Sequence, residues 1–117
     1  MPAPEFVIYH NPRCSKSRQA LELLRAHGAE PHIIEYLKTP PTAAQLKALL
    51  ARLGLKPEAV VRKGEDLYKA RFKGRAMSDA QWLATLAENP VLLKRPIVVK
   101  GAKAVLARPP ARVEELF

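Results

Sequence analysis

Cys14 is the only cysteine of the chain, and it lies between two segments that favour regular structure. Residues 6–10 are β-branched and aromatic, as in a short buried strand, and residues 15–27 carry apolar side chains at helical spacing. At a helix N-terminus, unpaired backbone N–H groups and the helix dipole favour negative charge. We therefore expect the pKa of Cys14 to be lowered and its sulfur to act as a nucleophile. The alternative is an inert thiol that fills space in the interior.

Several side chains near Cys14 could stabilise a thiolate. Four of them supply positive charge or hydrogen-bond donors: His10, Arg13, Lys16 and Arg18. Ser17 could donate a hydroxyl hydrogen bond to the sulfur. Because His10 ends an apolar strand, a purely structural histidine would explain it equally well.

Three arginines lie at junctions between predicted elements: Arg62, Arg95 and Arg108. Guanidinium groups hold tetrahedral oxyanions through paired N–H bonds and keep their charge, so the three could form an oxyanion pocket around Cys14. Each arginine taken alone is also explained as a solvated surface residue, and sequence separation leaves their distance in space open. Pro96 follows Arg95 and fits either a cis-proline beside Cys14 or a trans residue that begins a strand.

The elements that would position these residues alternate as in an α/β protein. Residues 31–36 predict a second strand, parallel to the first through a βαβ crossover. Capping-box sequences predict helices over residues 42–53 and 78–88, with a short helix and loop between them. Two strands of a hairpin and a final helical turn are predicted at residues 97–99, 104–106 and 113–117. We expect one domain over residues 1–117, a small mixed sheet that carries helices.

Composition narrows the classes of partner. Twenty Lys and Arg against eleven Asp and Glu give a net charge of +9, which attracts anions in general. The basic residues are scattered and aromatic residues make up only 6%, so we expect a small oxyanion and no nucleic acid. Apolar runs fall far short of the roughly 18 residues of a membrane span, and the first residues lack signal-peptide features. We expect a cytoplasmic monomer without membrane contact.

One cysteine can form neither an internal disulfide nor a thiolate metal site. We therefore expect no metal and no bound cofactor. If Cys14 is redox-active, its partner thiol must come from outside the chain.

Residues 10–18, His-Asn-Pro-Arg-Cys-Ser-Lys-Ser-Arg, resemble the His-Asn-Pro-x-Cys-x-x-Ser-Arg signature of the glutaredoxin-coupled arsenate reductases, the ArsC family. Further likenesses follow in the family's order at residues 37–41, 62–63, 89–90, 95–98 and 108–109. The resemblance covers nearly the whole chain. It implies a thioredoxin-like fold, with a mixed four-stranded sheet and a helical insertion after the first βαβ unit.

The resemblance also implies roles for the candidate residues. Cys14 would attack arsenate, and the oxyanion and the thiol-bound intermediate would be held by Arg62, Arg95 and Arg108. His10 and Ser17 would keep Cys14 ionised, and Pro96 would be the cis-proline of the fold. Glutathione and glutaredoxin would be the external reductants, giving a mixed disulfide at Cys14 and releasing arsenite.

Three other functions stay open. One is a glutathione-dependent thiol oxidoreductase of the same fold with another substrate. Another is a non-catalytic regulator that binds RNA polymerase, although such thiol sensors typically carry Cys-x-x-Cys and this chain has Ser17 at the second position. The last is a scaffold in which Cys14 is structural.

Overall fold

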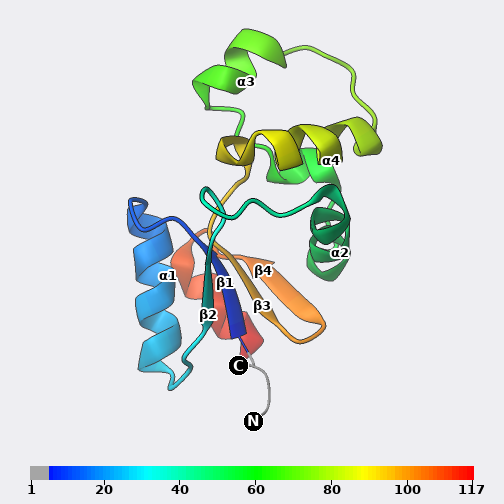
Figure 1. Cartoon of the computed structure of the whole chain (residues 1–117). Helices are drawn as coiled ribbons and strands as arrows, with labels where there is room; N and C mark the ends of the chain where they lie inside the picture. Colours follow the sequence, from blue (N-terminus) through cyan, green and yellow to red (C-terminus); the bar gives the residue numbers. More distant parts are fainter. Residues whose placement is uncertain (1–5) are drawn as a thin grey trace. The chain divides into compact units, whose positions relative to one another are not determined.

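Four strands form one mixed sheet in the order β2-β1-β3-β4 (Figure 1). The computed structural model describes residues 6–117. The strands span Phe6–His10 (β1), His32–Glu35 (β2), Ile97–Lys100 (β3) and Lys103–Leu106 (β4). β1 runs parallel to β2 and antiparallel to β3, and β3 and β4 form an antiparallel hairpin. The mixed α/β sheet predicted from the sequence is therefore confirmed.

The first βαβ unit is built around β1. Phe6, Ile8 and His10 point into the interior while the residues between them are half-buried, which is the alternation of a strand with one covered face. Helix α1 (Ser15–Ala26) follows after a four-residue loop and leads to the parallel strand β2. Because β1 ends at His10 and α1 begins at Ser15, the loop that carries Cys14 lies at the edge where the strand ends.

The sheet and α1 share one apolar core with the C-terminal 3-10 helix η3 (Pro110–Leu116). From α1 the core takes Ala20, Leu21 and Leu24, and from η3 it takes Val113 and Leu116. The final helical turn predicted from residue 113 begins three residues earlier, at Pro110. At the hairpin, Gly101 has φ of 59°, a left-handed conformation that suits glycine in a tight turn.

The chain divides into two compact units, Met1–Thr39 with Arg95–Phe117, and Pro40–Lys94. The second unit lies in sequence between β2 and β3, as the predicted helical insertion does. Its helices are α2 (Ala43–Leu53), η1 (Pro57–Val60), α3 (Asp66–Arg71), α4 (Asp79–Glu88) and η2 (Pro90–Leu92).

Both predicted capping boxes are present in the second unit. Thr42 and Gln45 bond each other's backbone N–H groups at the start of α2, and Ser78 and Gln81 do the same at α4. Trp82 is the largest fully buried side chain there, with the rings of two α3-region residues within 6.4 Å of its own. Over residues 6–117, none of the helices combines the length and apolarity needed to cross a bilayer.

Candidate active site

Cys14 occupies the N-cap position of α1. Its φ and ψ of −91° and 121° are extended, and its carbonyl accepts the first helical hydrogen bond, 3.0 Å from the backbone N of Arg18. The loop before it is held by Asn11, whose backbone O accepts from the N–H of Cys14 at 3.0 Å and whose Oδ1 accepts from the N–H of Arg13 at 3.0 Å. The half-buried thiol therefore sits on an ordered turn at the helix N-terminus.

The surroundings of Cys14 favour the thiolate. Burial by itself raises the pKa of the thiol, but the backbone N–H groups of Ser17 and Lys16 in the first turn of α1 lower it. The guanidinium of Arg95 lowers it further through a hydrogen bond and through its charge, so that the pKa lies below the usual 9.0. This is the direction predicted from the position of Cys14 before a helix.

Ser17 acts on the site in a different way from the predicted one. Its side chain is fully buried, and its Oγ accepts from the backbone N–H of Asn11 at 3.1 Å and lies 2.7 Å from Nδ1 of His10. Within residues 6–117 this hydroxyl bonds the end of β1 and makes no hydrogen bond to the sulfur, and it is the Ser17 backbone N–H that lowers the pKa of the thiol. The reason is geometric: at the first turn of a helix the free N–H groups point toward the N-cap, which leaves the hydroxyl for the end of β1.

Of the two roles that the sequence suggested for His10, positive charge or a hydrogen-bond donor, the surroundings of the imidazole disfavour the first. Burial lowers its pKa, an effect opposed by the nearby charge of Glu35 and reinforced by those of Arg18 and Arg25. The imidazole is therefore neutral at neutral pH, since its pKa lies below the usual 6.5. His10 can hold Ser17 by a hydrogen bond, but it contributes no charge to the stabilisation of a thiolate.

A pH-dependent stability follows from the buried, neutral His10. At pH values between the folded pKa of His10 and 6.5, the unfolded chain binds more protons than the folded chain does. The neutral imidazole therefore stabilises the fold above pH 6.5, and this contribution is lost as the pH falls through the folded pKa of His10. We expect His10→Gln to flatten the decline of unfolding free energy below pH 6.5, measured by urea denaturation. Glutamine can still bond Ser17, so the variant isolates titration. A wild-type slope in the variant would contradict the buried neutral imidazole.

Two of the three predicted arginines lie in the same unit as Cys14. Arg95 lies near enough to the thiol to lower its pKa, and its buried Nε has no hydrogen-bond partner within residues 6–117, which leaves a donor available. Arg108 is exposed and donates from its guanidinium to the backbone O of Arg95 at 3.3 Å. The Arg95–Pro96 peptide bond is cis, one of the two forms that the sequence left open. The Arg108–Pro109 bond is also cis, which the sequence analysis did not foresee.

Arg62 belongs to the other unit. Its guanidinium forms an ion pair of 2.7 Å with Glu65, and both side chains are 28% exposed. The backbone N–H of Arg62 donates to the carbonyl of Leu92 at 2.7 Å, which fixes the residue within its own unit. A role for Arg62 in holding an oxyanion at Cys14 stays a prediction.

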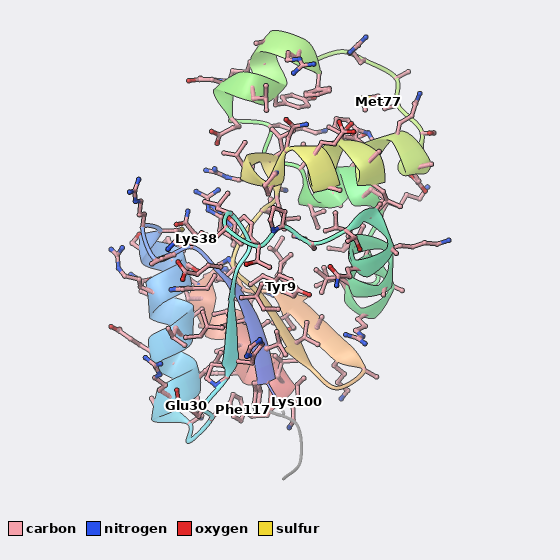
Figure 2. All side chains as sticks on the ribbon, in the orientation of Figure 1. Tyr9, Glu30, Lys38, Met77, Lys100 and Phe117 are labelled. Atoms are coloured by element: carbon pink, nitrogen blue, oxygen red, sulfur yellow. The ribbon has the colours of Figure 1, made fainter. Side chains whose placement is uncertain are left out.

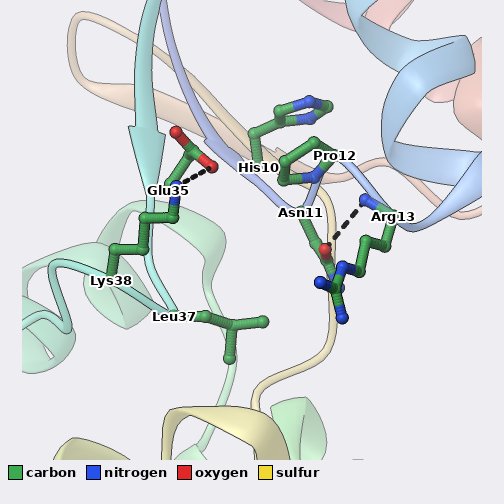
Figure 3. A pocket seen from close by; sticks show the side chains of 7 residues that line it. All are labelled: His10, Asn11, Pro12, Arg13, Glu35, Leu37 and Lys38. Atoms are coloured by element: carbon green, nitrogen blue, oxygen red, sulfur yellow. Dashed lines mark hydrogen bonds and ion pairs between the residues drawn. The ribbon is translucent and has the colours of Figure 1, made fainter.

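A cavity of about 270 Å³ adjoins the loop of Cys14 (Figure 3). Residues 10–13 form one wall, and Glu35, Leu37 and Lys38, at and after the end of β2, form the other. Sequence reasoning noted Arg13 only as a charge near the thiol and did not assign Glu35, Leu37 or Lys38 to a site. The parallel pairing of β1 and β2 is the signal that could have found them, because it brings both strand ends to one edge.

A different cluster marks the opposite end of the sheet, where β1 begins. Phe6 stacks on Phe117 with ring centroids 5.0 Å apart, and Lys100 lies over both rings and donates to the carbonyl of Leu116 at 3.0 Å. Figure 2 shows the side chains of Lys100 and Phe117 close together at this end. The cluster anchors the C-terminal helix far from the thiol. Within residues 6–117, His, Cys, Asp and Glu form no group of three that could hold a metal ion.

The sheet order β2-β1-β3-β4, the parallel β1–α1–β2 unit and the thiol at the start of α1 together define a thioredoxin-like α/β protein. The chain belongs to the ArsC family, whose model matches residues 9–116. It is 45% identical over 111 residues to the uncharacterized protein YfgD of Escherichia coli, with 93% of each chain covered. It is 41% identical over 116 residues to an arsenate reductase of Neisseria meningitidis, covering 97% of this chain and 99% of that one. The solved structure of an arsenate reductase from Vibrio cholerae matches with a TM-score of 0.94 at 45% identity, covering 99% and 100%.

Proposed function

We propose that this protein reduces arsenate to arsenite, with Cys14 as the nucleophile and with glutathione and glutaredoxin as the source of electrons. The observation that carries the proposal is the environment of Cys14, where two backbone N–H groups and Arg95 lower the pKa of the thiol. The Neisseria and Vibrio relatives are named as arsenate reductases, which suggests the substrate. The attack of a single thiol on an anionic substrate also fits a chain with one cysteine and a net charge of +9.

The first step is the attack of the Cys14 thiolate on the arsenic of bound arsenate. A sulfur–arsenic bond forms and one oxygen leaves as water, taking up protons from solvent. The lowered pKa matters here because only the thiolate attacks, and a thiol with an ordinary pKa is mostly protonated at neutral pH. Arg95 and Arg108, joined by Arg62 in this proposal, hold the remaining arsenate oxygens through paired N–H bonds.

The second step transfers two electrons to arsenic. The thiolate of glutathione attacks Sγ of Cys14, the sulfur–arsenic bond breaks, and its electron pair stays on arsenic, which leaves as arsenite. A disulfide between Cys14 and glutathione remains. Glutaredoxin then attacks the glutathione sulfur of that disulfide, so that Cys14 returns as a thiolate. An external thiol is needed because the chain has no second cysteine.

The proposal is tested by incubating the protein with arsenate, glutathione and glutaredoxin and measuring arsenite directly. We expect arsenite to appear in proportion to glutathione oxidised, and the rate to collapse when either glutaredoxin or arsenate is omitted. Absence of arsenite would overturn the proposal. Glutathione exchange on small mixed disulfides without any arsenite would instead assign the protein to the thiol oxidoreductases of this fold.

A further inference from the structure

The cavity beside the Cys14 loop offers a charged group that the proposed reaction has not used. Arg13 lies directly before Cys14, so their Cα atoms are about 3.8 Å apart. The backbone N–H of Arg13 is bonded to Asn11, but within residues 6–117 its guanidinium has no ion-pair or hydrogen-bond partner. Figure 3 shows the Arg13 guanidinium and the side chain of Leu37 turned toward each other across the cavity.

The other charged groups of the cavity are largely balanced. Lys38 pairs with Glu35 at 3.6 Å, and Figure 3 shows the lysine side chain folded back onto that carboxylate. Leu37 is 44% exposed, a large apolar side chain left open on the cavity wall. The cavity therefore presents one free guanidinium, an apolar wall and a neutralised ion pair, which suits a small ligand with a carboxylate and a short aliphatic part.

We propose that this cavity docks one end of glutathione, with a carboxylate of the peptide on the guanidinium of Arg13 and its aliphatic part against Leu37. The inference rests on the proposed function and deepens it, because it says where the attacking thiol is held. Glutathione is a tripeptide with its thiol on the central residue, and each end carries a carboxylate. A residue spans at most about 3.6 Å. Each terminal residue of glutathione is next to the residue that carries the thiol, and Arg13 in the cavity wall is next to Cys14, so the two spans match.

If glutathione docks at Arg13, the hydrogen-bond donors assigned to arsenate in the proposed reaction stay available for the oxyanion. In the proposed reaction the oxyanion is held by Arg62, Arg95 and Arg108, none of which lines this cavity. The thiol peptide and the oxyanion are therefore recognised by separate groups in this proposal. A neutral thiol has no carboxylate for Arg13, so the cavity discriminates in favour of an anionic thiol peptide.

The experiment compares glutathione with 2-mercaptoethanol, a neutral thiol, as reductant for arsenate. Because losing one charge-assisted contact is worth about a factor of ten, we expect Arg13→Ala to raise KM for glutathione about tenfold. Arg13→Glu should raise it further, and in both variants the loss with glutathione should be at least about tenfold larger than any change in the rate with 2-mercaptoethanol. Lys103→Ala, which removes an exposed positive charge on β4 outside the cavity, is the matched control and should behave as wild type.

A second measurement works without arsenate. The Cys14 thiolate attacks a sulfur of oxidised glutathione, the disulfide bond breaks, and one glutathione thiolate leaves while the other stays on Cys14. Mass spectrometry gives the rate of this reaction and of the matching reaction with 2-hydroxyethyl disulfide, a neutral compound. We expect Arg13→Glu to slow the glutathione reaction at least about tenfold relative to the neutral one.

The two measurements separate the two proposals. If Arg13→Glu changes both disulfide reactions equally, or neither, the docking site is overturned whatever happens to arsenate. If the selectivity for oxidised glutathione depends on Arg13 while no arsenite forms in the first assay, the docking site stands and arsenate reduction is the part that fails.

Discussion

Replacing Cys14 by serine is expected to abolish arsenate reduction, with a loss of at least about a thousandfold in turnover. A serine hydroxyl fits the same space, but it stays protonated at neutral pH and cannot form the disulfide that releases arsenite. The substitution removes the nucleophile and leaves the N-cap position occupied by a residue that favours it. Arsenite formation in the presence of glutathione and glutaredoxin is the measurement.

Ser15→Ala is the matched control for this variant. Ser15 is the next residue along the chain, is exposed, and is the first residue of α1. Its replacement therefore tests whether any change at the start of the helix is enough to abolish arsenate reduction. We expect it to retain wild-type turnover, and we expect both variants to unfold with cooperative transitions like that of the wild type. Arsenate reduction by Cys14→Ser at a rate near that of Ser15→Ala would contradict the nucleophilic role of the sulfur.

Replacing Arg95 by alanine is expected to raise the pKa of Cys14 and to weaken the transition state for attack on arsenate. The guanidinium lowers the pKa of Cys14 by a hydrogen bond and by its charge, so its loss favours the protonated thiol. In the proposed reaction the guanidinium of Arg95 also stabilises the negative charge that develops on the arsenate oxygens. Loss of one such donor typically costs about 10² to 10³ in rate, and we expect kcat/KM for arsenate to fall by that factor.

Two readouts separate these roles of Arg95. The pH dependence of Cys14 alkylation by iodoacetamide reports the thiolate alone, and its midpoint should move to higher pH in Arg95→Ala. Arg95→Lys keeps the charge and loses the planar fork, so it should restore part of the alkylation profile but little of kcat/KM. Arg52→Ala, an exposed arginine of α2, should change neither. An unchanged alkylation midpoint in Arg95→Ala would show that Arg95 does not act on the sulfur.

Local signals in the sequence located most elements. The Thr42 and Ser78 capping boxes are present as predicted because a capping box involves residues only three positions apart, and its geometry depends little on the rest of the fold. The parallel pairing of β1 and β2 followed from a short strand, a helix and a second strand in succession. The same reasoning placed Cys14 at a helix N-terminus and predicted the direction of its pKa.

The details that sequence reasoning missed depend on three-dimensional packing. Which groups the hydroxyl of Ser17 bonds depends on where the end of β1 lies, and no local pattern specifies that position. The neutral state of His10 depends on its burial, and burial is a property of the assembled sheet. The contact between Arg108 and the backbone of Arg95 joins residues from two sides of the β3–β4 hairpin.

The double use of Ser17 limits how the redox chemistry of this chain could change. A cysteine at position 17 would create the Cys-x-x-Cys spacing that allows a thiol to resolve its own disulfide. It would also replace the oxygen that ties the end of β1 to the first turn of α1, with a larger and weaker acceptor in a fully buried position. A second cysteine at position 17 would therefore weaken the hydrogen bonds that join β1 to α1, whereas the external thiol of the proposed reaction leaves these hydrogen bonds in place.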